Sequence, residues 1–436
     1  MTGRAAALTA LERCRREGAW ANAVLDAMAQ DGRLDQRETG LAYQLCLGVL
    51  QNQTYLDCYI DRFSTGKLQP KLRDILRLGA YQILFMDKIP DRAAVSESVL
   101  LSRQTGFHRA SGLVNAVLRR ISENKQELPA LPKEGTTDYL SIRYSHPQWL
   151  VWRLVDRYGY EFTEAFLAAN NTVCPTDLQI NTLRCSRESY VRALERAEIE
   201  YAVPPFPDDC VSVFGGRIRE LPGFEEGLFF VQDRAAAMAV QIAAPLPGME
   251  VLDACAAPGG KSLAAAIRMK GEGSVLSRDI HENKLYRLHS SAERLGLRCI
   301  RTGAADARAD DPQCRKRFDL VIADLPCSGL GVIRKRPEIR YKKEEEIASL
   351  PRLQREILDN LSAFVKPGGT LLYSTCTVLP EENDELVKAF LHDHSEFSPV
   401  DFTVDGRASA GGCYTFWPQI DGSDGFFAAK MKRTES

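Results

Sequence analysis

The chain has 436 residues and carries 56 Lys and Arg against 58 Asp and Glu, a formal net charge of −2. This near-neutral balance excludes a uniformly basic nucleic-acid-binding protein of the histone type, although it permits a local basic face. Hydrophobic residues make up 44% and charged residues 26% of the chain, which excludes wholesale disorder, and the length predicts two or three domains.

The twelve cysteines are too dilute for a disulfide scaffold. None of them belongs to a C-x-x-C pair, so the sequence predicts neither a zinc ribbon nor a thioredoxin-type site, and we expect no metal. No apolar run approaches the length of a membrane span, and the first residues carry no signal-peptide pattern. We therefore expect a reduced, cytoplasmic, soluble protein whose thiols are available for chemistry.

Residues 1–125 carry a net charge of +5, from 18 Lys and Arg against 13 Asp and Glu, whereas the rest of the chain carries −7. Their apolar residues recur at the spacing of one helical face. One stripe follows Pro70, a residue tolerated at a helix start, and comprises Leu72, Ile75, Leu76, Gly79 and Ile83. A second stripe comprises Leu113, Val114, Val117, Leu118 and Ile121. The spacing predicts an all-helical bundle, whose arginines are either solvated or face a nucleic acid.

Two segments of this part resemble the NusB-type antitermination fold. They are Val-Ser-Glu-Ser-Val at residues 95–99 and Gly-Leu-Val-Asn-Ala-Val-Leu-Arg-Arg at residues 112–120, of which Asn-Ala-Val-Leu-Arg is the most specific stretch. The resemblance implies a helical RNA-binding domain over residues 1–125. We expect a linker, containing Pro129 and Pro132, over residues 126–143.

Residues 144–233 are expected to form a small α+β subdomain that contacts RNA. A helix is predicted to start with residues 144–150, and its apolar positions are Leu150, Leu154, Val155 and Tyr158. Short alternating runs such as residues 178–183 then predict strands. The arginines of this part either face RNA or are solvated: Arg184, Arg187, Arg192, Arg196 and Arg217.

From residue 234 onward, predicted strands alternate with helices. The strands are expected at residues 249–254, 274–279, 299–303, 319–324 and 370–374, and the alternation implies βαβ units around a parallel sheet. Such sheets bind ligands beyond the carboxyl ends of their strands, where four aspartates lie: Asp253, Asp279, Asp306 and Asp324. One aspartate after a strand is usually a turn or cap residue, but four in consecutive units favour a ligand site.

The loop after the first of these strands has the sequence Cys-Ala-Ala-Pro-Gly-Gly-Lys-Ser over residues 255–262. Its end matches a P-loop, but Cys255 occupies the position of the first glycine, and the G-x-G-x-x-G of a dinucleotide-binding loop is also absent. Small residues permit close approach of a ligand, and the nearby carboxylates accept hydrogen bonds from ribose hydroxyls but repel phosphates. The loop therefore favours a ligand with a ribose and a cationic centre over a polyphosphate.

Three motifs resemble those of the RNA (cytosine-5) methyltransferases. They are residues 253–261, Asp-Leu-Pro-Cys-Ser-Gly at 324–329 and Ser-Thr-Cys-Thr-Val at 374–378, with Pro-Glu-Ile-Arg-Tyr at 337–341 and Pro-Glu-Glu-Asn at 380–383 as further similarities. Leu325 and Thr377 depart from the family, which commonly has Ala and Ser there. Together with the NusB-like part, the motif order resembles the ribosomal RNA small subunit methyltransferase B family. The resemblance implies a Rossmann-like methyltransferase domain over residues 234–436, after the helical bundle and the α+β subdomain.

The same resemblance implies that the protein methylates carbon 5 of a cytidine in small-subunit (16S-type) ribosomal RNA with S-adenosyl-L-methionine. In the matching motifs Cys376 is the nucleophile that adds to carbon 6, and Cys327 assists release of the product. Asp324 is expected to hydrogen-bond the base edge. The residues expected to bind the cofactor are Cys255, Ala256, Ala257, Pro258, Gly259, Gly260, Lys261, Asp279, Asp306 and Asp324.

Several alternatives stay open at this point. Lys261 lies near the cofactor or the target base, or it is an ordinary helix-start lysine. The residues after the Pro-Cys motif either hold phosphates and stack on a base or form a solvated helix: Arg334, Lys335, Arg336, Arg340, Tyr341, Lys342 and Lys343. We expect a monomer whose partner is small-subunit ribosomal RNA. The alternatives are the same reaction on transfer RNA, or a non-catalytic ribosome assembly factor, against which the two cysteines and four aspartates argue.

Overall fold

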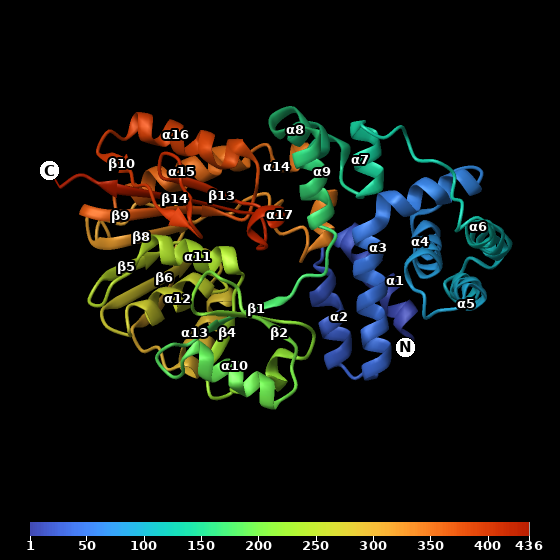
Figure 1. Ribbon diagram of the computed structural model, residues 1–436, viewed down its shortest axis with the longest axis horizontal. Helices are drawn as coiled ribbons and strands as arrows, with labels where there is room; N and C mark the ends of the chain where they lie inside the picture. The colour runs from blue at the N-terminus through green and yellow to red at the C-terminus, as the bar shows by residue number, and fades with distance from the viewer. Residues whose placement is uncertain (436) are drawn as a thin grey trace. The chain divides into compact units, whose positions relative to one another are not determined.

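The computed structural model describes residues 1–435, which form two compact units (Figure 1). One unit comprises residues 1–172 together with the short segment 333–342, and the other holds the remaining residues. Among residues 1–435, no helix combines the length and the apolar character that crossing a membrane requires. The finer boundaries expected from the sequence, at residues 125, 143 and 233, stay predictions.

The first unit is all-helical, as expected. Its helices are α1 (Gly3–Glu17), α2 (Ala21–Gln30), α3 (Gln36–Phe63), α4 (Pro70–Phe85), α5 (Asp91–Gln104), α6 (Ser111–Glu123), α7 (Thr137–Arg143), α8 (Gln148–Tyr158) and α9 (Tyr160–Ala169), with the short 3-10 helices η1 (His108–Ala110) and, from the inserted segment, η3 (Pro337–Tyr341). The predicted stripe of α4 is buried, and so is the stripe of α6 apart from the half-buried Leu113. Burial of these two stripes in one core confirms the predicted helical faces.

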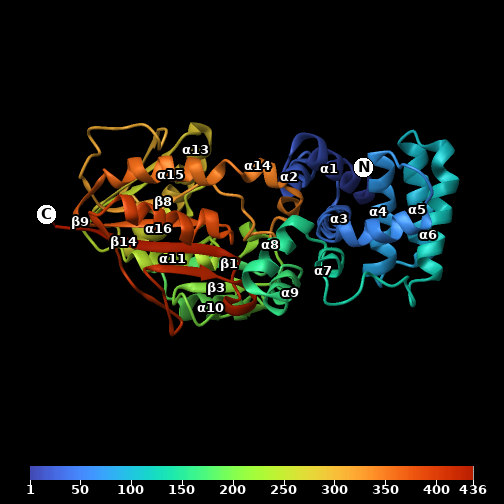
Figure 2. The ribbon, with the colours of Figure 1, turned by 90° about the horizontal axis from the view of Figure 1, so that it is seen from above.

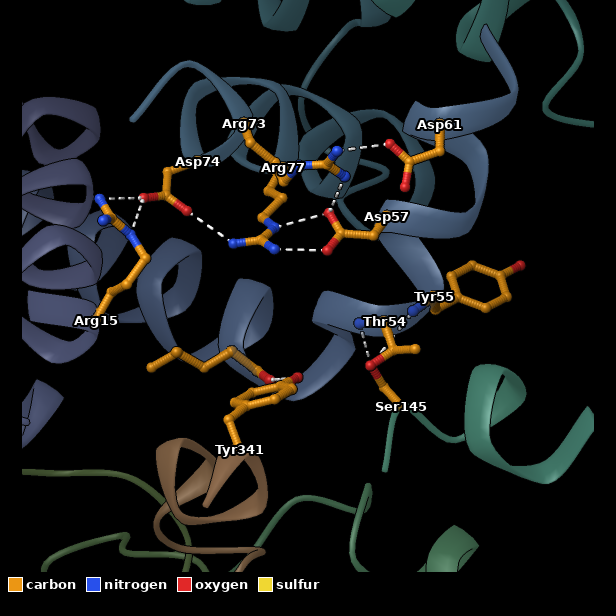
Figure 3. A network of polar contacts seen from close by, with 11 residues as sticks. Arg15, Thr54, Tyr55, Asp57, Asp61, Arg73, Asp74, Arg77, Ser145 and Tyr341 are labelled. Atoms are coloured by element: carbon orange, nitrogen blue, oxygen red, sulfur yellow. Dashed lines mark hydrogen bonds and ion pairs between the residues drawn. The ribbon is translucent and has the colours of Figure 1, made fainter. Parts of the chain in front are cut away.

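Helix α3 is kinked at Asn52, whose φ of −117° and ψ of 17° are not helical. A kink breaks the ladder of backbone hydrogen bonds, so the freed groups need other partners. The side-chain amide of Asn52 donates to the Gly48 carbonyl at 2.9 Å. The Ser145 hydroxyl oxygen accepts from the backbone N–H groups of Thr54 and Tyr55, at 2.7 and 3.3 Å (Figure 3).

The inserted segment, residues 333–342, donates hydrogen bonds to the freed carbonyls of α3. The Tyr341 hydroxyl donates to the Leu50 carbonyl at 2.5 Å (Figure 3). Arg340 is completely buried, and its guanidinium lies 2.7–3.3 Å from the carbonyls of Gln51, Tyr144 and Ser145 and from Asn171 Oδ1. These acceptors are all uncharged, and burial lowers the pKa of Arg340 to about 10. The hypothesis that Arg340 and Tyr341 hold phosphates and stack on a base is therefore wrong, because both side chains are used inside the helical unit.

Replacing Arg340 with methionine is expected to destabilise the protein by on the order of 3 kcal/mol, because several buried carbonyls lose their donor at once. Arg352→Met, at an exposed position of helix α15 (Leu350–Ser362), is the control and should change stability by less than about 0.5 kcal/mol. Denaturant unfolding of the full-length variants measures the difference. A shift for Arg340→Met no larger than that of the control contradicts the structural role of the guanidinium.

A second polar network links α1, α3 and α4 within the same unit (Figure 3). Arg77 is nearly buried and pairs with Asp57 at 2.5 Å and with Asp74 at 2.8 Å. Asp74 also pairs with Arg15, and Asp57 with Arg73. The alternative that the arginines of the bundle are solvated is thus wrong for Arg77, because two carboxylates compensate its charge inside the unit.

The second unit begins with a small antiparallel sheet. Its strand order is β2 (Tyr201–Ala202), β3 (Cys210–Val213), β1 (Thr176–Ile180) and β4 (Phe229–Val231), and helix α10 (Arg187–Arg196) packs on it through Tyr190 and Leu194. This arrangement confirms the small α+β part expected from the alternating runs.

The large sheet has the order β10 (Phe397–Pro399), β14 (Phe426–Arg433), β9 (Val365–Thr375), β8 (Phe318–Asp324), β5 (Glu250–Asp253), β6 (Ser274–Asp279) and β7 (Ile300–Ala304), and β13 (Cys413–Phe416) pairs with β14. Strands β5 to β9 are parallel, and β14 pairs with β9 in the antiparallel sense. Figure 2 shows β9 and β14 side by side along the sheet. The five parallel strands confirm those predicted from the sequence, and the Rossmann-like α/β class is also confirmed.

Helices cover both faces of this sheet (Figure 1). Helices α11 (Arg234–Ala243), α12 (Gly260–Arg268) and α13 (Glu282–Leu295) share one core with the sheet, and α15 and α16 (Asp384–Asp393) share the other. The chain runs from β5 outward to β6 and β7, and then returns to β8 on the other side of β5. Ligands of such sheets bind where the strand order reverses, which is beyond the ends of β5 and β8.

Short elements complete the second unit. They are η2 (Ile218–Glu220), α14 (Glu344–Ile347), η4 (Pro380–Glu382), the β11 (Thr403–Val404) and β12 (Arg407–Ala408) hairpin, and α17 (Pro418–Asp421). Of these, η4 matters for the site, because it follows β9 and carries a buried glutamate.

Candidate active site

Two thiols meet at the carboxyl ends of neighbouring parallel strands. Cys327 lies three residues beyond β8, and Cys376 directly follows β9. Their sulfur atoms are 3.1 Å apart, and the backbone N–H of Cys376 donates to the Cys327 sulfur at 3.3 Å. The structure thus brings together the two cysteines that the motifs singled out among twelve. Both are partly exposed, as a thiol that meets a substrate must be.

The two thiols differ in their surroundings. The hydrogen bond with Cys376, desolvation and the charge of Glu382 raise the pKa of Cys327 well above its usual value. Cys327 therefore keeps its proton at neutral pH and can donate it to the sulfur of Cys376. Two negative charges 3.1 Å apart would repel each other, so the arrangement opposes ionisation of both thiols at once.

The loop after β5 is tied to the end of β6. Asp279 accepts through one oxygen from the backbone N–H of Ala257, at 3.2 Å, and through the other from that of His281, at 2.9 Å. Gly259 has a φ of +115°, and a Cβ there would come within 2.4 Å of Leu288, so glycine is required at this position. The Cys255 side chain packs against the core between the sheet and α15, and burial raises its pKa.

Asp253 is buried at the end of β5. Its Oδ2 accepts from the Ser262 hydroxyl at 2.6 Å, and Ser277 donates to Ser262 at 2.7 Å. Its Oδ1 has no hydrogen-bond partner in the structure, which leaves one carboxylate oxygen for a ligand hydroxyl. Burial raises the pKa of Asp253 to about 7.

Asp253→Asn is expected to flatten the dependence of stability on pH. The folded pKa of about 7 exceeds the ordinary value of 3.8, so folding favours the protonated acid, and stability is lost as pH rises from about 4 through 7. The loss is on the order of 4 kcal/mol for a shift of this size. Unfolding of wild type and variant without cofactor, at pH 4 and pH 8, measures it. An exposed control, Asp405→Asn, should follow wild type, and a variant with the wild-type slope contradicts the assignment.

Asp324 and Lys261 form an ion pair beside the thiols. Lys261 Nζ lies 2.6 Å from Asp324 Oδ2, and the Ser374 hydroxyl donates to Asp324 Oδ1 at 2.8 Å. Lys261 is buried and its ammonium lies 5.0 Å from the centre of the Phe426 ring. Lys261 is therefore not an ordinary solvated helix-start lysine, because it joins the loop helix to the end of β8.

Asp306 lies beyond β7 at the rim of a pocket of about 300 Å³. Its carboxylate is held by the guanidinium of Arg308, with Nη2 at 2.6 Å. The pocket is also lined by Leu252, Leu361 and Phe364, whose side chains offer an apolar surface for a flat ring. Of the four strand-end aspartates, Asp306 lines this pocket, whereas Asp253, Asp279 and Asp324 do not.

Known proteins resemble the chain over its whole length. It is 34% identical to the "Probable ribosomal RNA small subunit methyltransferase B" of Bacillus subtilis, over 98% of both chains. It is 33% identical to the "Ribosomal RNA small subunit methyltransferase B" of Shigella sonnei, also over 98% of both. The 16S rRNA methyltransferase RsmB/F model matches residues 240–432. The chain belongs to this methyltransferase family.

Two further family models match the earlier parts. The NusB family matches residues 1–123, and the ferredoxin-like domain of RsmF/B-like methyltransferases matches residues 146–215. The crystal structure of PH0851 has a TM-score of 0.83 and 26% identity, covering 99% of this chain and 98% of that one. These matches confirm the NusB-like N-terminal part and the family membership expected from the motifs.

Three residues at or beside the candidate site were not assigned a role from the sequence. Ile280 follows Asp279 and is 58% exposed, an apolar side chain next to a candidate ribose-binding carboxylate. Glu382 and Asn383 are buried and contact the chain on either side of the two cysteines. Their only signal in the sequence is the Pro-Glu-Glu-Asn similarity, which says nothing about which loop each residue contacts.

Proposed function

We propose that the chain methylates carbon 5 of a cytidine in small-subunit ribosomal RNA, with S-adenosyl-L-methionine, through a covalent bond between Cys376 and carbon 6. The observation that carries the proposal is the pair of sulfur atoms 3.1 Å apart at the ends of β8 and β9. Carbon 5 of cytosine is a poor nucleophile, and addition of a thiolate to carbon 6 makes it enamine-like. Such covalent catalysis splits one difficult step into easier ones.

The environment of the thiols supports Cys376 as the nucleophile. Contact with Cys376, desolvation and the charge of Glu382 keep the proton on Cys327, which leaves Cys376, whose sulfur lies 3.1 Å away, as the thiol that attacks carbon 6. After methylation a base takes the carbon 5 proton, the C–H electron pair re-forms the double bond between carbons 5 and 6, and the bond from carbon 6 to Cys376 breaks to return the Cys376 thiolate. Cys327, in contact with Cys376 throughout, is the group that assists this release.

The residues proposed to hold the cofactor fit a nucleoside with a cationic centre. They are Cys255, Ala256, Ala257, Pro258, Gly259, Gly260, Lys261, Asp279, Asp306 and Asp324. The partnerless Oδ1 of Asp253 and the pocket of about 300 Å³ beside Asp306 support this fit, with Ile280 as an apolar contact for the adenine ring. When bound, S-adenosyl-L-methionine supplies an electrophilic methyl group on its sulfonium.

Asp324 is proposed to hydrogen-bond the edge of the target base. Its ion pair with Lys261 and its hydrogen bond from Ser374 hold the carboxylate in place at the end of β8. The base must leave its stack to be reached on both faces, which costs a few kcal/mol and less in a single strand. A monomer acting in the cytoplasm stays a prediction from the sequence.

Bisulfite sequencing of RNA from cells with and without the protein tests the substrate. We expect the loss of 5-methylcytosine at one position of small-subunit ribosomal RNA. Loss in a transfer RNA instead supports the transfer RNA alternative. Unchanged ribosomal and transfer RNA contradicts catalysis on either and supports the assembly-factor alternative.

A further inference from the structure

Glu382 and Asn383 are adjacent buried residues, each of which contacts the chain around a different cysteine. Glu382 Oε2 accepts from the Ser328 N–H at 2.9 Å and from the Gln354 side-chain amide at 2.8 Å. The same Gln354 amide donates to the Pro326 carbonyl at 2.9 Å. Since Pro326 and Ser328 flank Cys327, the backbone on both sides of this cysteine is held through Glu382 and Gln354.

Asn383 holds the other cysteine in the same way. Its side-chain carbonyl accepts from the Thr375 hydroxyl at 2.6 Å, and its amide donates to the Thr377 carbonyl at 3.0 Å. Thr375 and Thr377 flank Cys376. The two cysteine loops are also joined directly, because the hydroxyls of Ser328 and Thr377 are 2.7 Å apart.

The charge of Glu382 is placed where it affects one thiol of the pair. The titratable groups around Cys327 are Cys376, Glu382 and Tyr373, together with Asp324, whose charge Lys261 offsets. Tyr373 donates its hydroxyl proton to the backbone carbonyl of Glu382 at 2.5 Å and is neutral. Glu382 is thus the one uncompensated anion in this set, and an anion opposes ionisation of a neighbouring thiol.

We propose that Glu382 is the positioning residue of the two-cysteine centre: it fixes the Cys327 loop and keeps the proton on Cys327, so that Cys376 is the thiol that attacks. The inference rests on the proposed function above. Asn383 completes the frame by fixing the turn that carries Cys376. Glu382 and Asn383 set the distance between the two sulfur atoms, and the charge of Glu382 opposes ionisation of Cys327.

Two variants separate the effect of the Glu382 charge from the effect of its side-chain length. Glu382→Gln keeps the length and an acceptor oxygen but removes the charge. Glu382→Asp keeps the charge but is one methylene too short for the contacts with Ser328 and Gln354. Glu385→Gln, at an exposed position of α16, is the matched control for loss of a glutamate charge nearby.

Initial rates of iodoacetamide alkylation at each cysteine, followed by peptide mass spectrometry across a pH series, report the two thiols. We expect Glu382→Gln to move the alkylation midpoint of Cys327 down by about one pH unit, and Glu382→Asp and Glu385→Gln to leave it at the wild-type value. For both Glu382 variants we expect kcat to fall about tenfold or more, with KM values within about twofold, as for a loss confined to the transition state.

An unchanged Cys327 midpoint in folded Glu382→Gln overturns the electrostatic role. Wild-type kcat in Glu382→Asp overturns the positioning role, and it decides that part even if the glutamine variant does not fold. A purely structural glutamate would lower the melting temperature and the active fraction without moving the midpoint. Because alkylation needs neither RNA nor cofactor, its result is independent of whether the proposed methylation reaction is correct.

Discussion

Replacing Cys376 with alanine is expected to abolish methyl transfer, lowering turnover at least about a thousandfold, because without a thiolate carbon 5 of cytosine is not activated. Cys376 directly follows β9, and its sulfur lies 3.1 Å from that of Cys327. Transfer of the labelled methyl group from S-adenosyl-L-methionine to small-subunit ribosomal RNA measures the loss.

The control for this prediction is Cys299→Ala, which removes a partly exposed thiol before β7 and should retain wild-type turnover. Cofactor and RNA binding by Cys376→Ala, measured separately, should stay close to wild type, since alanine leaves the loop after β5 intact. Normal turnover by Cys376→Ala contradicts the nucleophile assignment and with it the proposed covalent mechanism.

Replacing Cys327 with alanine is expected to trap the protein on its RNA. Cys376 can still add to carbon 6, but the group that assists release is missing, so the covalent complex accumulates. Turnover should fall about a hundredfold or more, as when one positioned proton donor is removed. The complex is measured as a band of reduced mobility on a denaturing gel, formed with RNA and S-adenosyl-L-methionine.

The double variant Cys327→Ala/Cys376→Ala separates a covalent adduct from tight binding, because it lacks the nucleophile and should give no such band. A Cys327→Ala protein that turns over normally without an adduct contradicts the division of labour between the two thiols. An adduct that survives in the double variant shows that another residue is attached to the RNA.

Much of the site was predictable because its residues lie in short contiguous motifs. The strand-end aspartates and the loop of residues 255–261 follow directly from the βαβ pattern, since in a parallel sheet all strand ends meet at one edge. The same argument places Cys327 and Cys376 at that edge. The 3.1 Å distance between their sulfur atoms depends on the pairing of β8 with β9, which no local sequence pattern predicts.

The basic run after the Pro-Cys motif shows where sequence reasoning failed. Arginine and tyrosine in a charged segment are usually exposed, so Arg340 and Tyr341 were expected either to meet RNA or to be solvated. Both side chains instead donate hydrogen bonds to carbonyls freed at the kink of α3, almost 300 positions earlier in the chain. Neither the kink at Asn52 nor the insertion of residues 333–342 into the helical unit has a signature in the local sequence.

The sequence by itself determined the three-part fold class, the family, the loop after β5 and the two cysteines, because these depend on periodicity and on motifs whose residues are neighbours in the chain. Only the tertiary structure decided that Lys261 pairs with Asp324, that Arg340 is buried, and that Glu382 and Asn383 frame the thiols. The physical reason is that hydrogen bonding and desolvation act between atoms that folding brings together, whatever their separation in sequence.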